Sequence, residues 1–301
     1  MRPTIYIVSD GKPGHLAQSR GLADAIARRV DINTVEINLT NPSKDADRAS
    51  ARDGLVLSAG RRTYTHALGF ARDRALPAIA LMNPGWLKRK RFGLCVIPRH
   101  DGVAESRNVV VTEGALNGIT PATNSAPNQA LLLIGGPSKH HRWEDESMLA
   151  QLHTLLSRDP DVRWTATGSR RTPDATDKLL RRLADEHGGR FLYTPASETP
   201  RGWVAEQLSR CGVCWVSEDS VSMVYEALTA GARVGLLEVP RRPGKPGRVV
   251  RGVESLAERG WVTPFHDWRA GQALSGDRPA LAEADRVADV ILQRWPSLTN
   301  G

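Results

Sequence analysis

Short runs of β-branched and other apolar residues alternate with amphipathic stretches of helical length along the 301-residue chain. This alternation is typical of βα units built around a parallel sheet. Residues His15–Arg29 show the apolar spacing of an amphipathic helix. In the first part of the chain, the predicted strands are Thr4–Val8, Thr34–Leu39, Gly54–Leu57, Ala78–Leu81, Leu94–Ile97 and Val109–Val111.

A second series of strands and helices follows a polar stretch. Residues 117–129 are rich in Gly, Thr, Pro, Ala, Asn and Ser and lack an apolar period, which predicts a linker or a long surface loop. A final helix is predicted at Leu281–Trp295. The predicted strands of this part are Leu131–Ile134, Val162–Thr165, Phe191–Tyr193, Val213–Val216 and Arg233–Leu237.

The pattern predicts an α/β fold of two doubly wound, Rossmann-type halves. We assign residues 1–117 to the first domain, 118–130 to the linker and 131–280 to the second domain. Residues 281–301 form a terminal helix that could pack back on the first domain. Ligands of such sheets bind beyond the carboxyl ends of the strands, so we expect the site in those loops, at the cleft between the halves.

Composition excludes several classes of protein. Hydrophobic residues at 40% and charged residues at 25% describe an ordinary globular chain. No run approaches the roughly 18–20 apolar residues of a membrane-spanning helix. The first apolar run stops at Ser9, too short for a secretory signal. Three cysteines are too few for a disulfide framework, which favours the cytoplasm.

The formal charge of +8 is concentrated in two segments. Without the nine cations of these segments, 32 Lys and Arg side chains remain against 33 Asp and Glu, so the rest of the chain is nearly neutral. The segments are Lys88-Arg89-Lys90-Arg91 and the group Arg241, Arg242, Lys245, Arg248 and Arg251.

The first predicted strand leads into Asp10-Gly11-Lys12-Pro13-Gly14-His15 at the start of a helix. Gly11 and Gly14 permit a tight turn and a close approach of a ligand to the backbone. An imidazole with a pKa near ~6.5 can take a proton from a hydroxyl at neutral pH, so His15 is the candidate general base. The alternative is an ordinary turn with a capping histidine.

The second half opens in a similar way. A buried run ends in Gly135-Gly136-Pro137-Ser138-Lys139-His140-His141, where Gly135, Gly136, Ser138 and Lys139 could contact a phosphate. The segment matches neither a P-loop nor a dinucleotide fingerprint. The adjacent histidines lack the spacing of metal ligands, so we predict no metal site.

A third candidate begins where the strand ending at Val216 meets the next helix. Asp219 or Ser220 could cap this helix, and a nucleoside diphosphate could place its phosphates on the amides near Ser220, Ser222 and Met223. Glu226, nearly two turns later, could accept hydrogen bonds from ribose hydroxyls. A capped surface helix is the alternative.

Two further loops place arginine and hydroxyl groups after predicted strands, as phosphate recognition requires. The candidates are Ser58, Gly60 and Arg61 in the first half, and Ser169 and Arg170 in the second. Either arginine loop could equally be a solvated helix cap.

The cationic segment Lys88–Arg91 follows Trp86 and Leu87 and precedes Phe92. Aromatic residues around four cations suit the headgroup region of an anionic membrane or an acidic acceptor, with Trp86, Lys88, Arg89, Lys90 and Arg91 as contacts. A solvated basic loop is the alternative. Nucleic acid is not a predicted partner, because no binding motif is present and aromatic residues are only 5% of the chain.

Six ordered motifs resemble the bacterial family named after the plant mitochondrial-fission factor "elongated mitochondria". The resemblance spans nearly the whole chain and implies a GT-B-like fold of two facing Rossmann-type domains. Bacterial members are assigned as glycosyltransferases, some linked to lipooligosaccharide core assembly. The motifs are Asp10–His15, Pro98–Gly102, Asn108–Asn117, Ile134–Lys139, Ser169–Pro173 and Ser217–Ala227.

A more distant similarity is to the lipid-linked peptidoglycan N-acetylglucosaminyltransferase. Its N-terminal Gly-Gly-His loop, with a proposed base, resembles Gly11–His15. The ribose-binding glutamate of its C-terminal helix corresponds to Glu226, and Gly231 matches the spacing. The segment Gly135–Ser138 departs from that family's Gly-Gly-Ser loop, because it contains Pro137.

The resemblance implies a sugar transferase that uses neither a metal nor a bound cofactor. A nucleotide-sugar donor would bind the second domain, and a glycolipid or lipooligosaccharide-type acceptor would be deprotonated by His15. Arg170 or Lys139 would offset charge on the departing diphosphate. The expected location is cytoplasmic, peripheral to the inner face of the cytoplasmic membrane. Two alternatives stay open: a non-catalytic membrane-associated adaptor and a nucleotide-sugar epimerase.

Overall fold

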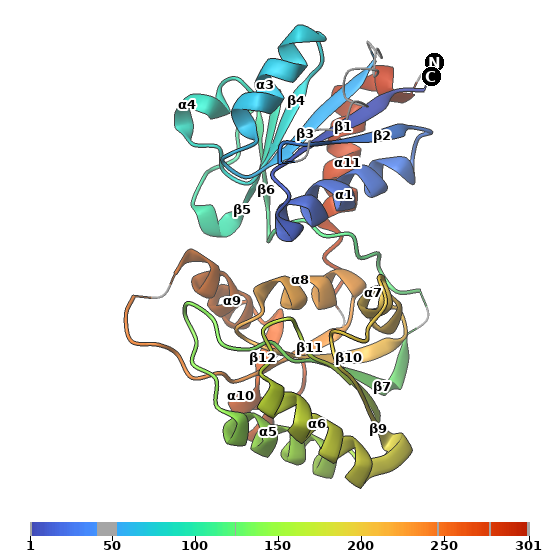
Figure 1. The fold of residues 1–301 in the computed structure, drawn as a ribbon, viewed down its shortest axis with the longest axis vertical. Coiled ribbons are helices and arrows are strands. Elements are labelled where there is room, and N and C mark those ends of the chain that lie inside the picture. The colour runs from blue at the N-terminus through green and yellow to red at the C-terminus, as the bar shows by residue number, and fades with distance from the viewer. Residues whose placement is uncertain (1, 41–52, 124, 246, 277, 300–301) are drawn as a thin grey trace. The chain divides into compact units, whose positions relative to one another are not determined.

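The computed structural model describes residues 2–40, 53–123, 125–245, 247–276 and 278–299, without the side chains of Arg248 and Val249. The chain forms two compact units. Unit 1 comprises residues 1–118 and 282–301, and unit 2 comprises residues 119–281. Each described unit contains a six-stranded sheet with helices on both faces (Figure 1). The fold class predicted from the sequence, two Rossmann-type α/β units, is confirmed.

The sheet of unit 1 has the order β2-β1-β3-β4-β5-β6, and all its pairings are parallel. Its strands are β1 (Thr4–Ser9), β2 (Asn33–Asn38), β3 (Gly54–Ala59), β4 (Ala78–Leu81), β5 (Leu94–Pro98) and β6 (Val109–Thr112). Its helical segments are α1 (Pro13–Ala27), α3 (Tyr64–Asp73), α4 (Trp86–Arg89), α11 (Glu283–Arg294) and the 3-10 turns at Arg99–Asp101 and Pro296–Thr299.

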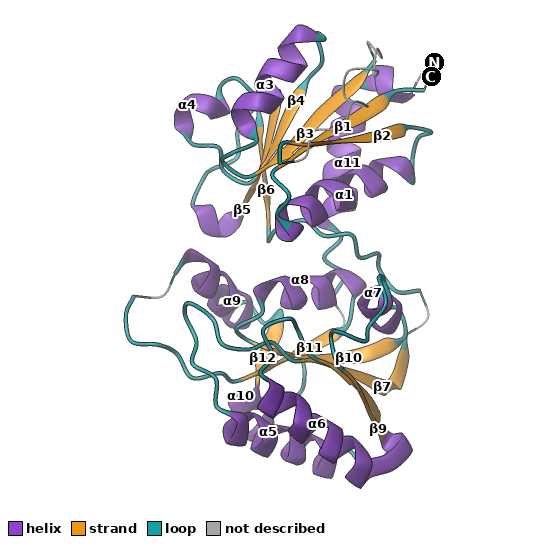
Figure 2. Ribbon diagram, viewed as in Figure 1, coloured by secondary structure: helices purple, strands orange, loops and turns teal. Residues whose placement is uncertain are grey.

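The core of unit 1 lies on both faces of its sheet. Strands β1 and β3 are buried along their whole length, as expected for central strands of a parallel sheet. Leu22 and Ile26 of α1 pack with Ile291 of α11 over one face. Tyr64 and Leu68 of α3 cover the other. Helices α1 and α3, which follow β1 and β3, therefore lie on opposite sides of the sheet (Figure 2).

Helix α11 joins the rest of unit 1 through apolar packing and ion pairs. Arg29 forms ion pairs with Asp285, at 2.7 Å, and with Asp289, at 2.5 Å. Arg28 also contacts Asp285, at 2.9 Å. Burial alone raises the pKa of Asp285, but the Arg29 and Arg28 hydrogen bonds hold it below its usual value. The last helix thus completes the face that α1 begins.

The sheet of unit 2 has the order β12-β11-β10-β7-β8-β9, again with all pairings parallel. Its strands are β7 (Ala126–Leu133), β8 (Arg163–Thr167), β9 (Phe191–Thr194), β10 (Cys211–Ser217), β11 (Arg233–Leu237) and β12 (Val262–Pro264). Its helical segments are α5 (Asp145–Arg158), α6 (Asp174–His187), α7 (Trp203–Leu208), α8 (Val221–Ala230), α9 (Arg248–Glu258), α10 (Phe265–Arg269) and the 3-10 turn Gly188–Arg190.

Two strands of unit 2 differ from the sequence prediction. β7 begins at Ala126, inside the predicted linker, because residues 126–129 continue the ladder beside β10 and β8 although most of them are exposed. β12 has three residues and ends at Pro264, so its apolar run is too short to produce a period.

Helices cover both faces of the second sheet. α5, α6 and α10 lie over one face, and α7, α8 and α9 over the other (Figure 2). Leu152 and Trp268 belong to the first of these layers, and Val224 and Leu256 to the second. Cys211 and Cys214 are buried in the second layer, where burial raises the pKa of the Cys211 thiol to about 12.

Each sheet has one point where the strand order reverses direction. In unit 1 the chain runs outward from β1 to β2 and then returns to β3 on the other side of β1. In unit 2 it runs from β7 to β9 and returns to β10 on the other side of β7. The loops after neighbouring strands at such a point diverge toward opposite faces, which opens a crevice for a ligand. The ligand crevices are therefore expected at the loops after β1 and β3 in unit 1 and after β7 and β10 in unit 2.

Within the described residues, no helix has both the length and the apolar character needed to cross a bilayer.

We predict that Ile291→Ala destabilises unit 1. The Ile291 side chain is fully buried against α1, and removal of such a group costs about 2–5 kcal/mol. Urea unfolding should show this loss, and amide hydrogen exchange should rise in α1. The control Gln293→Ala changes an exposed residue of the same helix. Equal stability of the two variants would contradict the role given to α11.

Candidate functional site

His15 lies in the first turn of α1, in the loop that leaves β1 at the reversal point of unit 1. Its Nδ1 atom is 3.0 Å from Oδ1 of Asp10, whose side chain is only 4% exposed. Burial alone raises the pKa of Asp10, but hydrogen bonds from His15 and the Lys12 amide hold it below its usual value. An ionised Asp10 can only accept, so neutral His15 carries its proton on Nδ1 and keeps the Nε2 lone pair for a ligand.

The neighbouring loop after β3 supports the imidazole from the other side. Gly60 has φ +95°, and a Cβ atom placed on it would overlap the His15 ring. Only glycine combines this backbone conformation with such a close approach. Asp10 and Gly60 together fix the orientation of His15, and the sequence motif had suggested neither residue as its support.

The other candidates of unit 1 have different environments. Ser58 is fully buried in β3, 3.5 Å from the Ile79 carbonyl, so its hydroxyl is not among the groups that a ligand can reach. Arg61 is exposed. Gly11, at φ +75°, turns the chain after Asp10, and Gly14 accepts a hydrogen bond from Gln18 inside α1.

The loop after β7 is held against the loop after β10, at the reversal point of unit 2. The Gly135 amide donates to Ser217 Oγ at 2.7 Å, and the Gly136 amide donates to Asp219 Oδ2 at 3.1 Å. A Cβ at Gly135 would overlap the Asp219 carboxylate. Because both amides are already hydrogen-bonded within the protein, the structure does not support them as phosphate donors.

Arg171 completes this loop. Its Nη2 is 2.8 Å from Asp219 Oδ2, and its Nη1 donates to the Gly136 carbonyl at 2.8 Å. Ser169 accepts a hydrogen bond from the Arg171 amide, whereas the Arg170 side chain is exposed. Arg171, the second arginine of the pair, therefore makes the contact with Gly136 and Asp219, and Arg170 does not. The adjacent residues look alike in sequence, and the geometry of the turn separates them.

Ser138 is also engaged within its loop. Its hydroxyl accepts from the amides of His140 and His141 and lies 3.2 Å from His141 Nδ1. Burial lowers the pKa of His141, which therefore stays neutral at pH 7. Lys139 is exposed at the outer side of the same loop.

Helix α8 starts immediately after this junction. Ser220 is its N-cap residue but makes no side-chain cap hydrogen bond, and Asp219 contacts Gly136 and Arg171, so neither predicted side-chain cap is formed. The first amides of a helix lack partners inside the helix and favour an anion. Ser222 is exposed and Met223 is half-buried at this end.

Glu226 lies further along α8 and is half-buried. Burial raises the pKa of its carboxyl from 4.5 to about 7. Within the described part of the chain, burial accounts for this rise, and no hydrogen bond or nearby cation offsets it. A carboxyl group that bears a burial cost without a protein partner is well suited to receive hydroxyl groups from a ligand.

Helix α4 follows β4 and contains Lys88 and Arg89, the first two cations of the cationic segment. Trp86 and Leu87 are each 63% exposed, and Lys90 Nζ lies 5.7 Å from the Trp86 ring centroid. Lys88 donates to Thr65, while Arg89 and Arg91 form no ion pair within the described part of the chain. Phe92 is buried against Tyr64, so it belongs to the core and not to the surface patch expected from the sequence.

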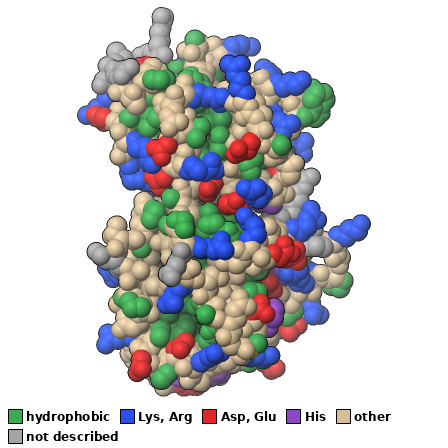
Figure 3. All heavy atoms as spheres, turned by 180° about the vertical axis from the view of Figure 1, so that it is seen from behind, with side chains coloured by type: hydrophobic (Ala, Val, Ile, Leu, Met, Phe, Trp, Pro, Cys, Tyr) green, Lys and Arg blue, Asp and Glu red, His purple; other side chains and the backbone are tan. Residues whose placement is uncertain are grey.

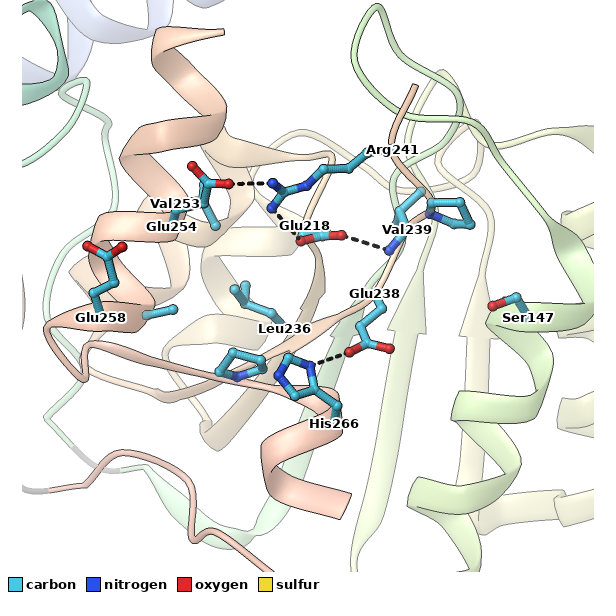
Figure 4. A pocket seen from close by; sticks show the side chains of 13 residues that line it. Ser147, Glu218, Leu236, Glu238, Val239, Arg241, Val253, Glu254, Glu258 and His266 are labelled. Carbon is cyan, nitrogen blue, oxygen red and sulfur yellow. Dashed lines mark hydrogen bonds and ion pairs between the residues drawn. The ribbon is translucent and has the colours of Figure 1, made fainter. Parts of the chain in front are cut away.

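A cavity of about 610 Å³ lies beyond the ends of β10 and β11, between α9 and α10 (Figure 4). None of the side chains predicted as site residues lines it. Arg241 pairs with Glu218 and Glu254, and His266 pairs with Glu238 at 2.5 Å (Figure 4). Burial raises the pKa of Glu218 despite a hydrogen bond from the Val239 amide. Four glutamates, including Glu258, make this cavity unfavourable for anions.

In the described ranges, no group of three His, Cys, Asp or Glu side chains is arranged to hold a metal ion. The face shown in Figure 3 carries Lys and Arg interspersed with Asp and Glu, without one continuous basic surface.

Solved structures with the same architecture show the fold. An assigned UDP-N-acetylglucosamine 2-epimerase from Listeria monocytogenes matches with a TM-score of 0.55 at 10% identity, over 99% of this chain and 91% of that chain. A UDP-glucosyltransferase from Polygonum tinctorium capable of glucosylating indoxyl, in complex with 3,4-dichloroaniline, matches with a TM-score of 0.53 at 13% identity, over 100% and 97%. The fold is therefore of the GT-B glycosyltransferase type.

A further structure, MurG from Acinetobacter baumannii, matches with a TM-score of 0.48 at 11% identity, over 99% of this chain and 93% of that chain. No curated protein sequence matches the chain. The profile described as mitochondrial fission ELM1 matches residues 13–295, which is most of the chain. The protein therefore belongs to the mitochondrial fission ELM1 family.

Proposed function

We propose that this protein is a metal-independent glycosyltransferase that moves a sugar from a nucleotide-sugar donor to a glycolipid or lipooligosaccharide-type acceptor. The observation that carries the proposal is the Asp10–His15 pair, at 3.0 Å, seated on Gly60 at the reversal point of unit 1. It supplies an oriented base with a free Nε2. The UDP-glucosyltransferase that shares the fold supports the same chemistry.

In the proposed reaction, His15 Nε2 takes the proton of an acceptor hydroxyl. The hydroxyl oxygen forms a bond to the anomeric carbon of the donor sugar, and the bond from that carbon to the diphosphate oxygen breaks. The nucleoside diphosphate leaves with the electron pair. Ionised Asp10 stabilises the imidazolium that forms on His15, since it already accepts from Nδ1.

Unit 2 supplies the donor site in this proposal. The phosphates bind the amides at the start of α8, near Ser220, Ser222 and Met223, where no side chain caps the helix. Glu226 accepts hydrogen bonds from the ribose hydroxyls. Gly135 and Gly136 shape the neighbouring loop without donating to the phosphates, since their amides bind Ser217 and Asp219. Lys139 and Arg170 are the exposed cations of this region that could offset charge on the diphosphate.

The acceptor is proposed to lie at an anionic membrane surface. The exposed Trp86 and Leu87 stand next to Lys88, Arg89, Lys90 and Arg91 on and after α4. Apolar side chains that enter the headgroup region beside cations contribute both burial and attraction to anionic lipid. A protein bound in this way is peripheral to the inner face of the cytoplasmic membrane.

We predict that His15→Ala lowers transfer about 10²–10⁴-fold, the usual contribution of general base catalysis, while donor affinity is unchanged. Gly60→Ala should lower kcat as well, because the new methyl group displaces the imidazole. Product formation is measured by mass spectrometry with UDP-glucose or UDP-N-acetylglucosamine and a truncated lipooligosaccharide.

The matched control for these variants is Gly69→Ala, since a Cβ at this helical glycine of unit 1 has open space. Turnover of His15→Ala equal to wild type would refute the assignment of the base. Sugar conversion without an acceptor would indicate the epimerase, and a failure to bind UDP, GDP or CMP in calorimetry would indicate the adaptor.

We predict that Glu226→Gln weakens nucleotide-sugar binding and stabilises the fold. Folding raises the pKa of Glu226 from 4.5 to about 7, so between these pH values the folded state holds a proton that the unfolded state has lost. The free energy of unfolding therefore falls as the pH rises through about 7. At pH 8 the variant should unfold with a free energy higher by on the order of 2 kcal/mol. The exposed Glu186→Gln is the control.

Donor binding should have the opposite pH dependence. Ionised Glu226 accepts from ribose hydroxyls better than protonated Glu226, so the affinity for UDP-glucose should fall between pH 8 and pH 6. UDP-glucose suits this test because its phosphates do not titrate in that range. A Glu226→Gln variant that keeps the same pH profile in calorimetry would exclude Glu226 from the donor site.

We predict that reversing the charges of Lys88–Arg91 to Glu weakens binding to vesicles that contain anionic lipid by at least about tenfold, since each cation near such a surface contributes about 1 kcal/mol. Trp86→Ala with Leu87→Ala should weaken it further. The matched control reverses Lys178 and Arg182, two exposed cations of α6. Undiminished cosedimentation of the charge-reversed protein would exclude the membrane contact.

A further inference from the structure

A second cavity of about 380 Å³ lies in unit 2, beside the acid-lined one. It is formed by two segments about 100 residues apart in the chain, the loop after β7 and the loop after β11. Among the described residues, its charged lining consists of cations and contains no carboxylate. The residues of its lining are Lys139, His140, Arg241, Arg242, Pro243, Gly244, Lys245 and Val250.

Backbone hydrogen bonds hold the two loops together. The Arg242 amide donates to the His140 carbonyl at 2.8 Å, and the Arg142 amide donates to the Pro240 carbonyl at 2.7 Å. Arg242 Nε also donates to the Ser138 carbonyl at 3.2 Å. On the far side, a Cβ at Gly247 would lie 2.8 Å from the His140 ring, so the chain closes tightly against this imidazole. The walls are therefore constructed by specific contacts.

The cations of the cavity differ in how far they are neutralised. Arg241 stands between the two cavities and pairs with Glu218 and Glu254 of the acid-lined one. Lys139, Arg242 and Lys245 have no ion pair with any carboxylate in the described part of the chain. Three uncompensated positive charges around one cavity repel one another unless an anion binds between them.

We propose that this cavity binds an oxyanion of the sugar substrate, a carboxylate or a phosphate, that is distinct from the nucleotide diphosphate. None of its lining residues belongs to α8, where the proposed donor phosphates lie, and Lys139 is the one lining residue that the donor site would share. The acid-lined cavity beside it rejects the same group. The substrate is therefore an acidic sugar, and the inference rests on the proposed glycosyltransferase function.

The bound oxyanion can belong either to the donor sugar or to the acceptor, and calorimetry can separate these two cases. UDP-glucuronic acid against UDP-glucose tests an acidic donor sugar, and glucose 6-phosphate against glucose tests a phosphorylated acceptor. For one of these pairs, we expect the charged member to bind the full-length protein at least about tenfold more tightly. Lys245→Gln should reduce that preference about fivefold, as loss of one exposed cation would. Within the described residues, Lys245 makes no side-chain hydrogen bond that shapes the loop, whereas Arg242 does.

The control Lys178→Gln removes one exposed cation from α6. Equal binding within both pairs of probes would overturn the proposal, and so would a Lys245→Gln variant that weakens UDP itself as much as the charged sugar. Glucose 6-phosphate carries no nucleotide, so a Lys245-dependent preference for it would stand even if UDP failed to bind. A failure of the donor proposal can therefore be told apart from a failure of this one.

Discussion

Within each unit, the arrangement of the candidate site depends on close contact between the two loops at the reversal point of the sheet. In unit 1, the loop after β3 touches the loop after β1 where Gly60 meets His15. In unit 2, the loop after β7 touches the loop after β10 where Gly135 meets Asp219. Because the strands are parallel, both loops of each pair lie at the same edge of the sheet. Gly60 and Gly135 have no Cβ atom, so the two loops can come into contact there.

The same constraint gives the two units different chemistry. In unit 1 the contact orients an imidazole whose Nε2 is not used by Asp10, so a proton acceptor is left for a ligand. In unit 2 both glycine amides are hydrogen-bonded within the protein, Gly135 to Ser217 and Gly136 to Asp219 Oδ2, which also pairs with Arg171. The glycine loop of unit 2 therefore acts as a rigid wall, and the open donors lie at the start of α8.

The sequence was sufficient to predict eleven of the strands, because central strands of parallel sheets are continuous apolar runs. β12 escaped prediction because three residues form no pattern. Site residues were predictable only as loops. The conformation of the turn decides whether Arg170 or Arg171 contacts the glycine loop, and the sequence does not reveal it. Asp10 can hold His15 only because the loop folds so that the two side chains meet. Ser58 follows the alternation of β3 into the core, although its hydroxyl resembles that of a ligand-binding residue.

The distribution of charge carries information that the net charge of +8 does not. Arg241 belongs to the basic segment by sequence, yet Glu218 and Glu254 bind it and remove it from the charge that a ligand meets. Lys139 adds to that charge although it lies about 100 residues away. Because opposite charges line two adjacent cavities, the electrostatic field changes sign over a short distance at Arg241. A ligand with its charge at one end is oriented by such a change of sign, whereas a uniformly charged polymer such as DNA gains attraction from one cavity and repulsion from the other.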